Sequence, residues 1–389
     1  MLEVYHGRYR KLKGIYTMRG IFSLDFCLCV KYNNGVTDPD AMPKVANKKT
    51  ALEASIPLAC ADEAAAVAFL EAQRWGDTPN CPRCGDTDVT MMKAKDGSRN
   101  ARFLWRCHGC KQQYTVRVGT IMEDSPIPFR HWCLAFYRAS ASKKGISALQ
   151  IQRETGLTYK SALFLMHRIR WAMAPANAQE PKLSGTVEFD ETYIGGKPRY
   201  PARKDANVKY KGKAKDFDQR KTAVVGGVER DGRVKARVVR STRAAETAVI
   251  VREMVDTSAN LMTDESVIYK VVGQEYASHK RVKHALGQYV RYTADGEQVT
   301  TNRIEGFWAG LKRQLHGTHH AVSRKHLHRY VSEVEFKYNN RALTDGERTV
   351  KLIQACDHRR LTYAEQISTR DPETGHFIYG HRRSYGPEE

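Results

Sequence analysis

Two Cys-x-x-Cys pairs constrain the fold of this chain more than any other feature. Cys81 and Cys84 form the first pair, in CPRC, Cys107 and Cys110 form the second, in CHGC, and 22 residues separate the two pairs. Each pair can sit on a tight turn that points both thiolates at one ion, and four sulfurs at tetrahedral corners satisfy Zn²⁺ without an open position. The spacing therefore predicts a structural zinc ribbon. The alternatives are two coincidental motifs or a redox dithiol.

The segments around these cysteines indicate how such a ribbon is built. Residues 102–106 and 114–118 carry aromatic and β-branched side chains, which are typical of short strands. Upstream, apolar residues at helical spacing predict a helix over residues 61–74 that packs on the ribbon. Helix and ribbon together make a predicted region 60–124. Residues 1–55 lack sustained periodicity, so we expect an irregular leader there.

Charge and hydropathy narrow the class of protein. The 389 residues include 64 Lys and Arg against 43 Asp and Glu, a formal net charge of +21 that favours a polyanionic partner, either nucleic acid or an anionic membrane surface. No run of about 18 apolar residues exists, which excludes an integral membrane protein. Nine cysteines, an odd number, do not resemble a secreted disulfide framework. We expect a cytoplasmic protein.

A helix-turn-helix pattern follows the ribbon, in region 125–175. After a predicted helix over residues 128–142, Ser147 can cap a short helix, and residues 155–158 form a turn. A longer helix is predicted over residues 159–173.

The basic residues of that longer helix are the first candidate DNA contacts. In a helix-turn-helix module the second helix would lie in a major groove, and we expect Lys160, Arg168 and Arg170 to meet the DNA. The alternative is a plain helical hairpin with a solvated basic face, and the motif alone does not decide between the two.

Beyond a linker at residues 174–182, the composition changes to that of an α/β domain. Short β-rich runs and helical runs alternate, which predicts a mixed sheet flanked by helices over region 183–345, with a C-terminal extension over 346–389. The predicted strands are residues 186–190, 222–229, 233–239 and 260–263, and the predicted helix is 243–255.

A basic loop lies between the first two of these strands. Residues 197–221 contain ten Lys or Arg and three Asp, and Lys197, Lys211 and Lys213 are among them. We expect this loop to grip DNA phosphates without sequence preference. The alternative is a merely solvated loop.

Three acidic residues are candidates for catalysis. Asp190 ends the first predicted strand, in VEFDETYIGGK, and Asp264 follows another strand, in LMTDES. Glu305 lies in a predicted helix, with Asn302 one turn before it and Lys312 two turns after it on the same edge. Carboxylates from two strand ends and a helix are what a pair of divalent cations needs. The alternative is chance, because the chain holds 43 acidic residues. The helix itself is predicted by a buried apolar stripe at helical spacing: Ile304, Trp308, Leu311 and Leu315.

Taken together, these motifs resemble one family. CPRCG, WRCHGCKQQYTVRVGTIMEDSPIPFRHW, KKGISALQIQRETGLTYKSALFLMHRIRWAM, VEFDETYIGGK and NRIEGFWAGLKRQLHGTHHAVSRKHLHRYVSEVEFKYNNR are similar to the bacterial insertion-sequence transposases related to the eukaryotic Merlin elements, over residues 60–345 and in the same order. The resemblance implies an N-terminal zinc ribbon, a helix-turn-helix and a DDE catalytic domain of ribonuclease-H-like fold.

The resemblance also implies roles for individual residues. The acidic residues of the family fall on Asp190, Asp264 and Glu305, which would bind Mg²⁺ or Mn²⁺, while Zn²⁺ would be structural. Some members place Asn at the third position and keep a Lys nearby, so Asn302 and Lys312 are further candidates, Asn302 as a contact to DNA.

The function implied is transposition. Such a protein binds the terminal inverted repeats of its element in double-stranded DNA, cleaves there, and joins the 3′ ends to target DNA by two-metal phosphoryl transfer. We expect a homodimer or a larger synaptic assembly, bound at the nucleoid. One alternative is a non-catalytic zinc-ribbon and helix-turn-helix regulator with a degenerate nuclease-like domain, and another is a ribonuclease-H-like nuclease without strand transfer.

A rolling-circle nuclease motif is the last alternative. His326-Leu327-His328 spells its His-hydrophobic-His pattern, but that chemistry needs both histidines on one face of a strand. The surrounding apolar residues follow helical spacing, which separates the two histidines by roughly 200°. We therefore do not expect them to share an ion.

Overall fold

A computed structural model describes residues 51–175, 181–195 and 221–368, all within one compact unit, Lys49–Glu389. The part of the leader before residue 51 lies outside the described residues. So do residues 197–220 of the basic loop, with Lys197, Lys211 and Lys213. Among the described residues, no helix combines the length and the apolar character that crossing a membrane requires.

Two helices precede a small three-stranded sheet. Helix α1 (Ala51–Ala61) begins inside the segment for which we expected an irregular leader, and α2 (Glu63–Trp75) is the helix predicted over residues 61–74. The Asp62 side chain caps α2 by accepting a 2.7 Å hydrogen bond from the backbone N–H of Ala65. The sheet that follows has the order β1-β2-β3 and is antiparallel throughout, with strands β1 (Val89–Met91), β2 (Trp105–Cys107) and β3 (Gln113–Tyr114).

The next helices form at the predicted positions because their ends are capped. Ser147 accepts a hydrogen bond from the N–H of Gln150 at the start of α4 (Ala148–Thr155), and Gly156 ends that helix at a φ of 73°, where a side chain would be strained. Thr158 caps α5 (Tyr159–Met173) in the same way. Helix α3 (Phe129–Ala141) comes before both.

The C-terminal segment is part of this helical core. Helices α10 (Asp345–Gln354) and α11 (Tyr363–Ile367) lie within the predicted extension, but α10 packs against α3, and the hydroxyls of Ser140 and Thr349 are 2.7 Å apart in the interior. Leu352 and Ile353 belong to the same apolar cluster as Trp132. Residues 345–367 therefore belong to the helical core rather than extending beyond it.

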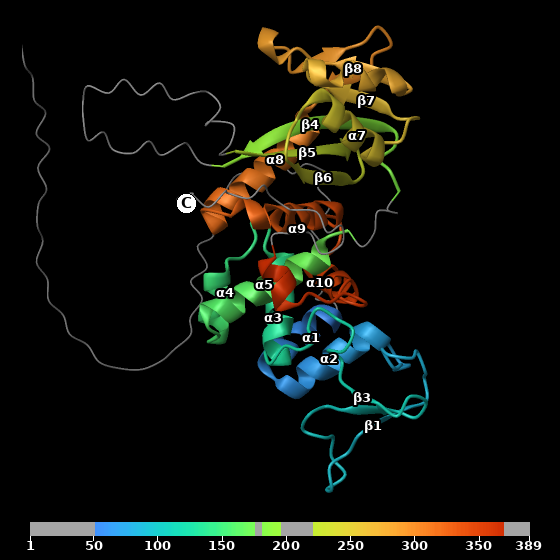
Figure 1. The fold of residues 1–389 in the computed structure, drawn as a ribbon, viewed down its shortest axis with the longest axis vertical. Coiled ribbons are helices and arrows are strands. Elements are labelled where there is room, and N and C mark those ends of the chain that lie inside the picture. The colour runs from blue at the N-terminus through green and yellow to red at the C-terminus, as the bar shows by residue number, and fades with distance from the viewer. Residues whose placement is uncertain (1–50, 176–180, 196–220, 369–389) are drawn as a thin grey trace, which may run out of the picture. The chain divides into compact units, whose positions relative to one another are not determined.

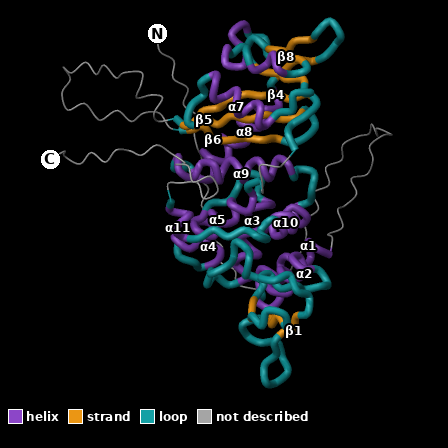
Figure 2. The backbone as a smooth tube through the Cα atoms, turned by 45° about the vertical axis from the view of Figure 1, so that its right-hand side comes forward, coloured by secondary structure: helices purple, strands orange, loops and turns teal. Residues whose placement is uncertain are grey.

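The second part of the fold is built on a five-stranded mixed sheet (Figures 1 and 2). Its order is β6-β5-β4-β7-β8, with β5 antiparallel to its neighbours β4 and β6, and with β7 and β8 parallel to β4. The first strand runs four residues past its predicted end at Asp190, and β8 was not predicted. The strands are β4 (Thr186–Ile194), β5 (Thr222–Glu229), β6 (Val234–Val239), β7 (Asn260–Thr263) and β8 (Ser278–Arg281).

Helices cover both faces of this sheet. Helix α7 (Ala244–Met254) packs with Val187, Phe189 and Leu261 on one face. Helices α8 (Asn302–Gln314) and α9 (Leu327–Asn339) pack with Val224 and Val228 on the other. A mixed sheet with helices on both faces fits the ribonuclease-H-like core that the resemblance implies.

The remaining elements are short. A hairpin of β9 (Val290–Tyr292) and β10 (Gln298–Thr300) lies between β8 and α8. A π-helical turn, Leu315–His319, continues α8. His326 ends a 3₁₀ turn and His328 lies in α9, so these two histidines are in helical backbone, as expected. The 3₁₀ turns are Val267–Tyr269, Val272–Glu275, His284–Leu286 and Arg324–His326.

Candidate active site and zinc site

Asp190 lies in the middle of the central strand β4 and faces α8. The indole N–H of Trp308 donates a 3.1 Å hydrogen bond to Asp190 Oδ2. Across the ladder Asp190 pairs with Gly226 of β5. A Cβ at Gly226 would lie 3.1 Å from the Trp308 ring and 2.6 Å from the carbonyl oxygen of Lys235. Any larger residue at this position would therefore push the Trp308 ring away from the strand, and glycine allows the ring to pack there.

Asp264 directly follows β7, the strand that pairs with the strand of Asp190. Strands β4 and β7 are parallel, with Val187 opposite Leu261 and Glu188 opposite Met262. Continuing this register by two residues places Asp264 level with Asp190, on strands about 4.8 Å apart. The N–H of Ser266 donates a 3.0 Å hydrogen bond to Asp264 Oδ1 and orients the carboxylate.

The surroundings of Asp190 oppose its ionisation. Burial raises the pKa of Asp190 to about 7, and the nearby carboxylates of Glu191 and Asp264 add to the rise, while the Trp308 hydrogen bond opposes it. A half-buried carboxylate beside two like charges is a site that a bound cation would stabilise.

The start of α8 is anchored on the same face of β4. Glu188, two residues before Asp190, is fully buried, and its Oε2 accepts hydrogen bonds from the backbone N–H groups of Arg303 (2.8 Å) and Ile304 (3.3 Å). A carboxylate at a helix N-terminus is favourable because the N–H groups there lack partners in the helix. This contact fixes where α8 crosses the sheet.

Glu305 lies in the first turn of α8, one turn before Trp308, and is 42% exposed. The hydroxyl of Thr301 donates a 3.1 Å hydrogen bond to Glu305 Oε1, and His284 Nε2 lies 3.6 Å from the same oxygen. Glu305 therefore lies at the partly exposed edge of the acidic site, in the first turn of α8.

The three acidic residues do not form a closed ligand set. Asp190 lies in β4, Asp264 follows the adjacent strand β7, and Glu305 comes from α8. Within residues 51–175, 181–195 and 221–368, the four ribbon cysteines are the one group of three or more potential ligands whose atoms all lie within 4.8 Å of one another. Asn302 and Lys312 are both exposed on α8.

Two acidic neighbours of Asp190 were missed from the sequence. Glu188 shares its face of β4, as the two-residue period of a strand requires. Glu191 points to the opposite face, where the hydroxyl of Tyr269 donates to its Oε2, and burial raises the pKa of Glu191. Three acidic residues within four positions of a largely buried strand were the available signal.

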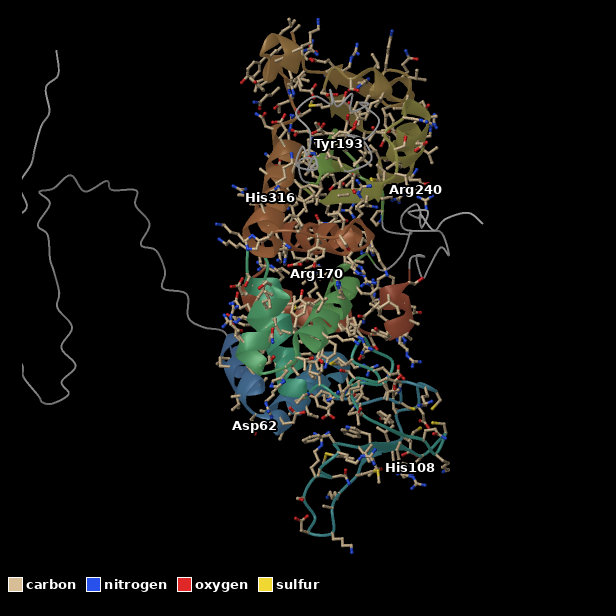
Figure 3. The ribbon with its side chains drawn as sticks, turned by 60° about the vertical axis from the view of Figure 1, so that its left-hand side comes forward. Asp62, His108, Arg170, Tyr193, Arg240 and His316 are labelled. Carbon is tan, nitrogen blue, oxygen red and sulfur yellow. The ribbon has the colours of Figure 1, made fainter. Side chains whose placement is uncertain are left out.

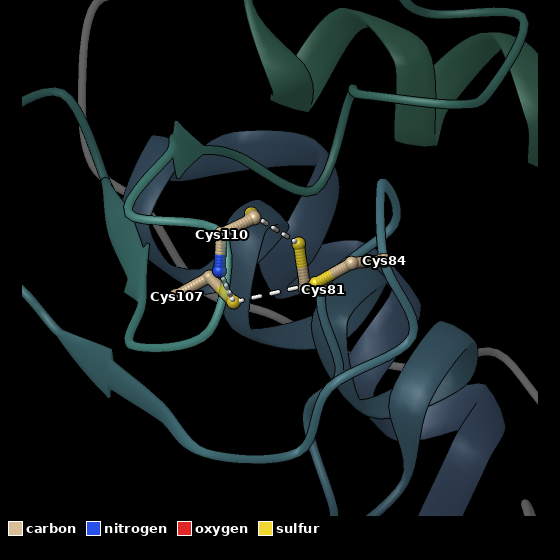
Figure 4. A group of neighbouring side chains, drawn as sticks. All are labelled: Cys81, Cys84, Cys107 and Cys110. Carbon is tan, nitrogen blue, oxygen red and sulfur yellow. Dashed lines mark hydrogen bonds between the residues drawn. The ribbon is translucent and has the colours of Figure 1, made fainter.

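The four ribbon cysteines converge as predicted (Figure 4). Their sulfur atoms all lie within 4.8 Å of one another, with Cys81 Sγ 3.7 Å from Cys110 Sγ and Cys84 Sγ 3.5 Å from Cys107 Sγ. Zn–S bonds of about 2.3 Å at tetrahedral angles place sulfurs about 3.8 Å apart. The geometry therefore fits a closed tetrahedral ion.

Helix α2 packs on the ribbon through aromatic side chains. Trp75 makes edge contacts with Trp105 and Tyr114, each with ring centroids 5.9 Å apart. Glu71 accepts a 2.7 Å hydrogen bond from the indole N–H of Trp105. The ribbon is thus joined to the helix that precedes it, as expected.

Two of the expected DNA contacts on α5 are instead structural. Arg170, labelled in Figure 3, is 1% exposed. Its Nε donates a 2.7 Å hydrogen bond to Glu333 of α9. Arg168 donates to the carbonyl oxygens of Ile121 (3.1 Å) and Glu123 (2.9 Å). The physical reason is that α5 packs against α3, α4, α9 and α11.

Lys160, in the first turn of α5, remains exposed, with its Nζ 5.8 Å from the ring of Phe164 and 5.4 Å from that of Tyr363. Tyr159 beside it is 48% exposed. The surface that α5 can offer to DNA is therefore its N-terminal end.

Comparison with known proteins agrees with the ribbon and the sheet. Residues 182–339, which hold all three acidic residues, match the ISXO2-like transposase domain, and residues 61–113, which hold the four cysteines, match the transposase zinc-ribbon domain. A protein of Halobacterium salinarum, described as an uncharacterized protein in transposable element ISH50, is 24% identical over 282 residues, covering 71% of this chain and 90% of the relative. The chain belongs to the insertion-sequence transposases that combine a zinc ribbon with an ISXO2-like transposase domain.

Proposed function

We propose that this transposase binds the terminal inverted repeats of its element, cleaves the DNA there and joins the 3′ ends to target DNA. The observation that carries the proposal is that Asp264 directly follows β7, the strand paired in parallel with β4, and lies close enough to Asp190 to raise its pKa, inside the matched transposase domain. Glu305, on the helix that crosses these strands, supplies the third acidic group.

The donor set fits divalent cations such as Mg²⁺ or Mn²⁺. Carboxylate oxygens are the hard ligands that these ions prefer, and burial of Asp190 beside like charges favours a bound cation. When bound, such ions supply the Lewis acidity that activates a water or a 3′ hydroxyl and stabilises charge on the phosphoryl group.

The chain's own contacts orient this donor set. Trp308 holds one oxygen of Asp190, and the backbone of Ser266 holds one oxygen of Asp264, so both carboxylates are fixed without being neutralised. Lys312, exposed two turns after Glu305, is placed to hold a phosphate of the DNA end.

We further propose that Zn²⁺ fills the four-cysteine cluster and that the ribbon and the first turn of α5, with Lys160, contact the terminal repeats. Lys197, Lys211 and Lys213 would add contacts to phosphates, and Asn302, exposed at the start of α8, would contact DNA near the acidic site. Because two element ends must be joined to one target, we expect a dimer or a larger assembly on DNA.

One observation favours a second candidate function. The acidic oxygens do not gather within 4.8 Å among the described residues, which is what a DNA-binding regulator with a degenerate catalytic domain would show. The regulator and the transposase share the charge and the ribbon and differ only in metal-dependent strand cleavage.

The experiment is a nicking assay with the full-length protein. Labelled duplexes that carry the inverted repeats flanking the gene are incubated with Mg²⁺ or Mn²⁺, and a plasmid is supplied as target. We expect nicked ends and strand-transfer products from the wild type. Asp190→Ala and Asp264→Ala should lose both products while retaining affinity for the duplex.

Glu246→Gln is the matched control, because Glu246 is an exposed acidic residue of α7, the helix on the opposite face of the same sheet. It should cleave normally. Cleavage by Asp190→Ala would refute the catalytic assignment. Nicking without transfer into the plasmid would identify a nuclease, and no nicking by the wild type would favour the regulator.

A further inference from the structure

A hollow of about 770 Å³ lies beside the second aspartate, at the carboxyl ends of β7 and β8. Glu265, the residue after Asp264, lines it, and so does Arg281, which ends β8 and pairs across the ladder with Thr263. Its volume lies in the range of pockets that hold small molecules. The acidic site and this hollow are therefore neighbours on one edge of the sheet.

The 3₁₀ turn His284–Leu286 joins the wall of the hollow to the acidic site. The N–H of Ala285 donates a 2.9 Å hydrogen bond to Glu265 Oε1, and His284 Nε2 lies 3.6 Å from Glu305 Oε1. A DNA strand that reaches Asp264 and Glu305 therefore passes along this turn.

The polar groups of the hollow include an acceptor and a donor without partners. Glu265 Oε2 and Arg291 Nε are both buried, and neither has a hydrogen-bond partner among the residues that the structure describes. A buried polar atom left unpaired is destabilising by about 1–3 kcal/mol. A ligand that carries both a donor and an acceptor would satisfy the two together.

The rim combines cations with exposed apolar side chains. Arg281 and Lys283 are exposed and line the hollow. Leu286, which also lines the hollow, is 76% exposed. Tyr289 does not line the hollow but follows Gln288, which does; it is 58% exposed and its ring centroid lies 5.4 Å from that of His284. Cations close to an exposed ring are typical of surfaces that bind unpaired nucleotides.

We propose that this hollow binds one unstacked nucleotide of the DNA strand held at the acidic site. The inference rests on the proposed function, because it needs DNA at Asp190 and Asp264. Small rotations of the two side chains turn Glu265 Oε2 and Arg291 Nε toward the hollow, where the base edge supplies an amino donor to Glu265 and an acceptor to Arg291, and Arg281 and Lys283 hold the adjoining phosphates. A base inside a duplex cannot enter a pocket, so the nucleotide must leave the stack.

The charges favour a nucleotide over a bare phosphate. A phosphate carries acceptors only and would be repelled by the carboxylate of Glu265, whereas adenine and cytosine each have an exocyclic amino group. Thymine lacks that group and should bind less well. The proposal thus predicts a preference for the base as well as for the backbone.

The test measures the affinity of the full-length protein for three labelled duplexes in divalent-free buffer, where cleavage does not occur. One duplex is blunt, one carries a short 3′ overhang of cytosines, and one carries the same overhang with abasic residues. We expect the cytosine overhang to bind roughly fivefold or more tighter than the abasic overhang. Equal affinity for the two overhangs would overturn the proposal and leave a phosphate site.

Substitutions of residues that line the hollow test whether the preference for the cytosine overhang arises there. Arg291→Gln and Glu265→Gln should bring the ratio of the two overhang affinities close to one while leaving the affinity for the blunt duplex unchanged. Lys283→Gln, at the exposed rim, should weaken both overhangs and is the variant least able to disturb folding. Lys270→Gln, an exposed lysine of the same domain outside the hollow, is the matched control. An unchanged ratio in Arg291→Gln, with folding intact by circular dichroism, would overturn the proposal.

This design separates the two hypotheses. Asp190→Ala should keep the base preference, because the hollow lies outside its contacts. A wild-type protein that prefers the cytosine overhang but does not nick terminal-repeat DNA would support the hollow and refute the proposed catalysis. A protein that nicks DNA but binds both overhangs equally would refute the hollow alone.

Discussion

Arg170 of α5 and Glu333 of α9 form an ion pair in which both side chains are at most 1% exposed and Nε lies 2.7 Å from Oε2. Lys337 donates a second 2.7 Å hydrogen bond to the other oxygen of Glu333. Burial alone would raise the pKa of Glu333, but the cations of Lys337 and Arg170 outweigh it and hold that pKa well below its usual range. Helix α5 is thereby bonded to α9, a helix that packs on the five-stranded sheet.

Removing the carboxylate of this pair should destabilise the protein strongly. Glu333→Gln leaves the buried cations of Arg170 and Lys337 without their counter-charge, and we expect a loss of about 3–5 kcal/mol in the free energy of unfolding, measured by urea denaturation. Arg170→Ala should cost less, because Lys337 still pairs with Glu333. Arg138→Gln breaks an exposed pair with Glu154 and should cost at most about 1 kcal/mol. Loss of DNA affinity in Arg170→Ala with unchanged stability would show instead that Arg170 contacts DNA.

Acid should destabilise the same junction through its histidines. Burial, aided by the cation of Arg170, lowers the pKa of His319 to about 4, and burial also lowers the pKa of His326 to about 3. Unfolded histidine titrates near 6.5, so between about pH 6.5 and 4 the unfolded state takes up protons that the folded state does not, and stability falls as pH falls.

The urea midpoint measured at pH 7, 6, 5 and 4 checks this expectation. Each of these two histidines can contribute at most about 1.4 kcal/mol per pH unit to that slope. His319→Gln should flatten the decline, whereas His358→Gln, on a histidine that is 86% exposed, should not. An identical decline in His319→Gln would contradict the assignment.

The sequence identified the elements of the fold better than their packing. The zinc ribbon followed from spacing alone, because ligand geometry is local. Helix α5 was also predicted at its observed bounds. Its periodicity does not reveal whether Arg170 meets DNA or Glu333, a partner 163 residues away. A long-range ion pair leaves no local signal in the chain.

The candidate site was also predicted only in part, because contacts between distant segments leave no local signal in the sequence. Asp190 and Asp264 were identified from the ends of apolar runs and from the family motifs. Strand β8 was missed because Ser-His-Lys-Arg shows no alternation of apolar and polar residues, so only backbone pairing with β7 defines it. The hollow beside Asp264 is built from that strand and the following turns, and it was therefore missed as well.

Removal of the ribbon metal should unfold the ribbon. Thiolate ligands make folding of a structural zinc site depend on the ion. We expect Cys107→Ser, or a strong chelator, to abolish stoichiometric zinc binding and to change the fluorescence of Trp75 and Trp105, which pack together beside the cysteines. Cys60→Ser, on a half-buried cysteine outside the ribbon, is the control and should retain zinc. Full zinc content in Cys107→Ser would disprove the site.

Two glycines near the acidic site should respond to alanine in opposite directions. At Gly226 a Cβ would meet the Lys235 carbonyl at 2.6 Å and the Trp308 ring at 3.1 Å, so Gly226→Ala should destabilise by about 1–3 kcal/mol and displace the indole from Asp190. Gly310 in α8 has nothing within 4 Å, so Gly310→Ala should stabilise by about 0.5–1 kcal/mol. Thermal denaturation and the nicking assay measure both, and a neutral Gly226→Ala would contradict the packing.

The third metal ligand can be decided between two residues on one turn of α8. Glu305 is held by Thr301 and His284 beside the paired aspartates, while Asn302 is exposed at the first position of the helix. If Glu305 is the ligand, Glu305→Gln should lower metal-dependent nicking at least about a hundredfold, whereas Asn302→Ala should weaken DNA affinity severalfold and change the cleavage rate little at saturating DNA. Single-turnover rates at several Mn²⁺ concentrations separate these effects, because loss of a ligand raises the Mn²⁺ concentration needed for half-maximal rate and loss of a DNA contact does not. The reverse pattern would assign the position to Asn302.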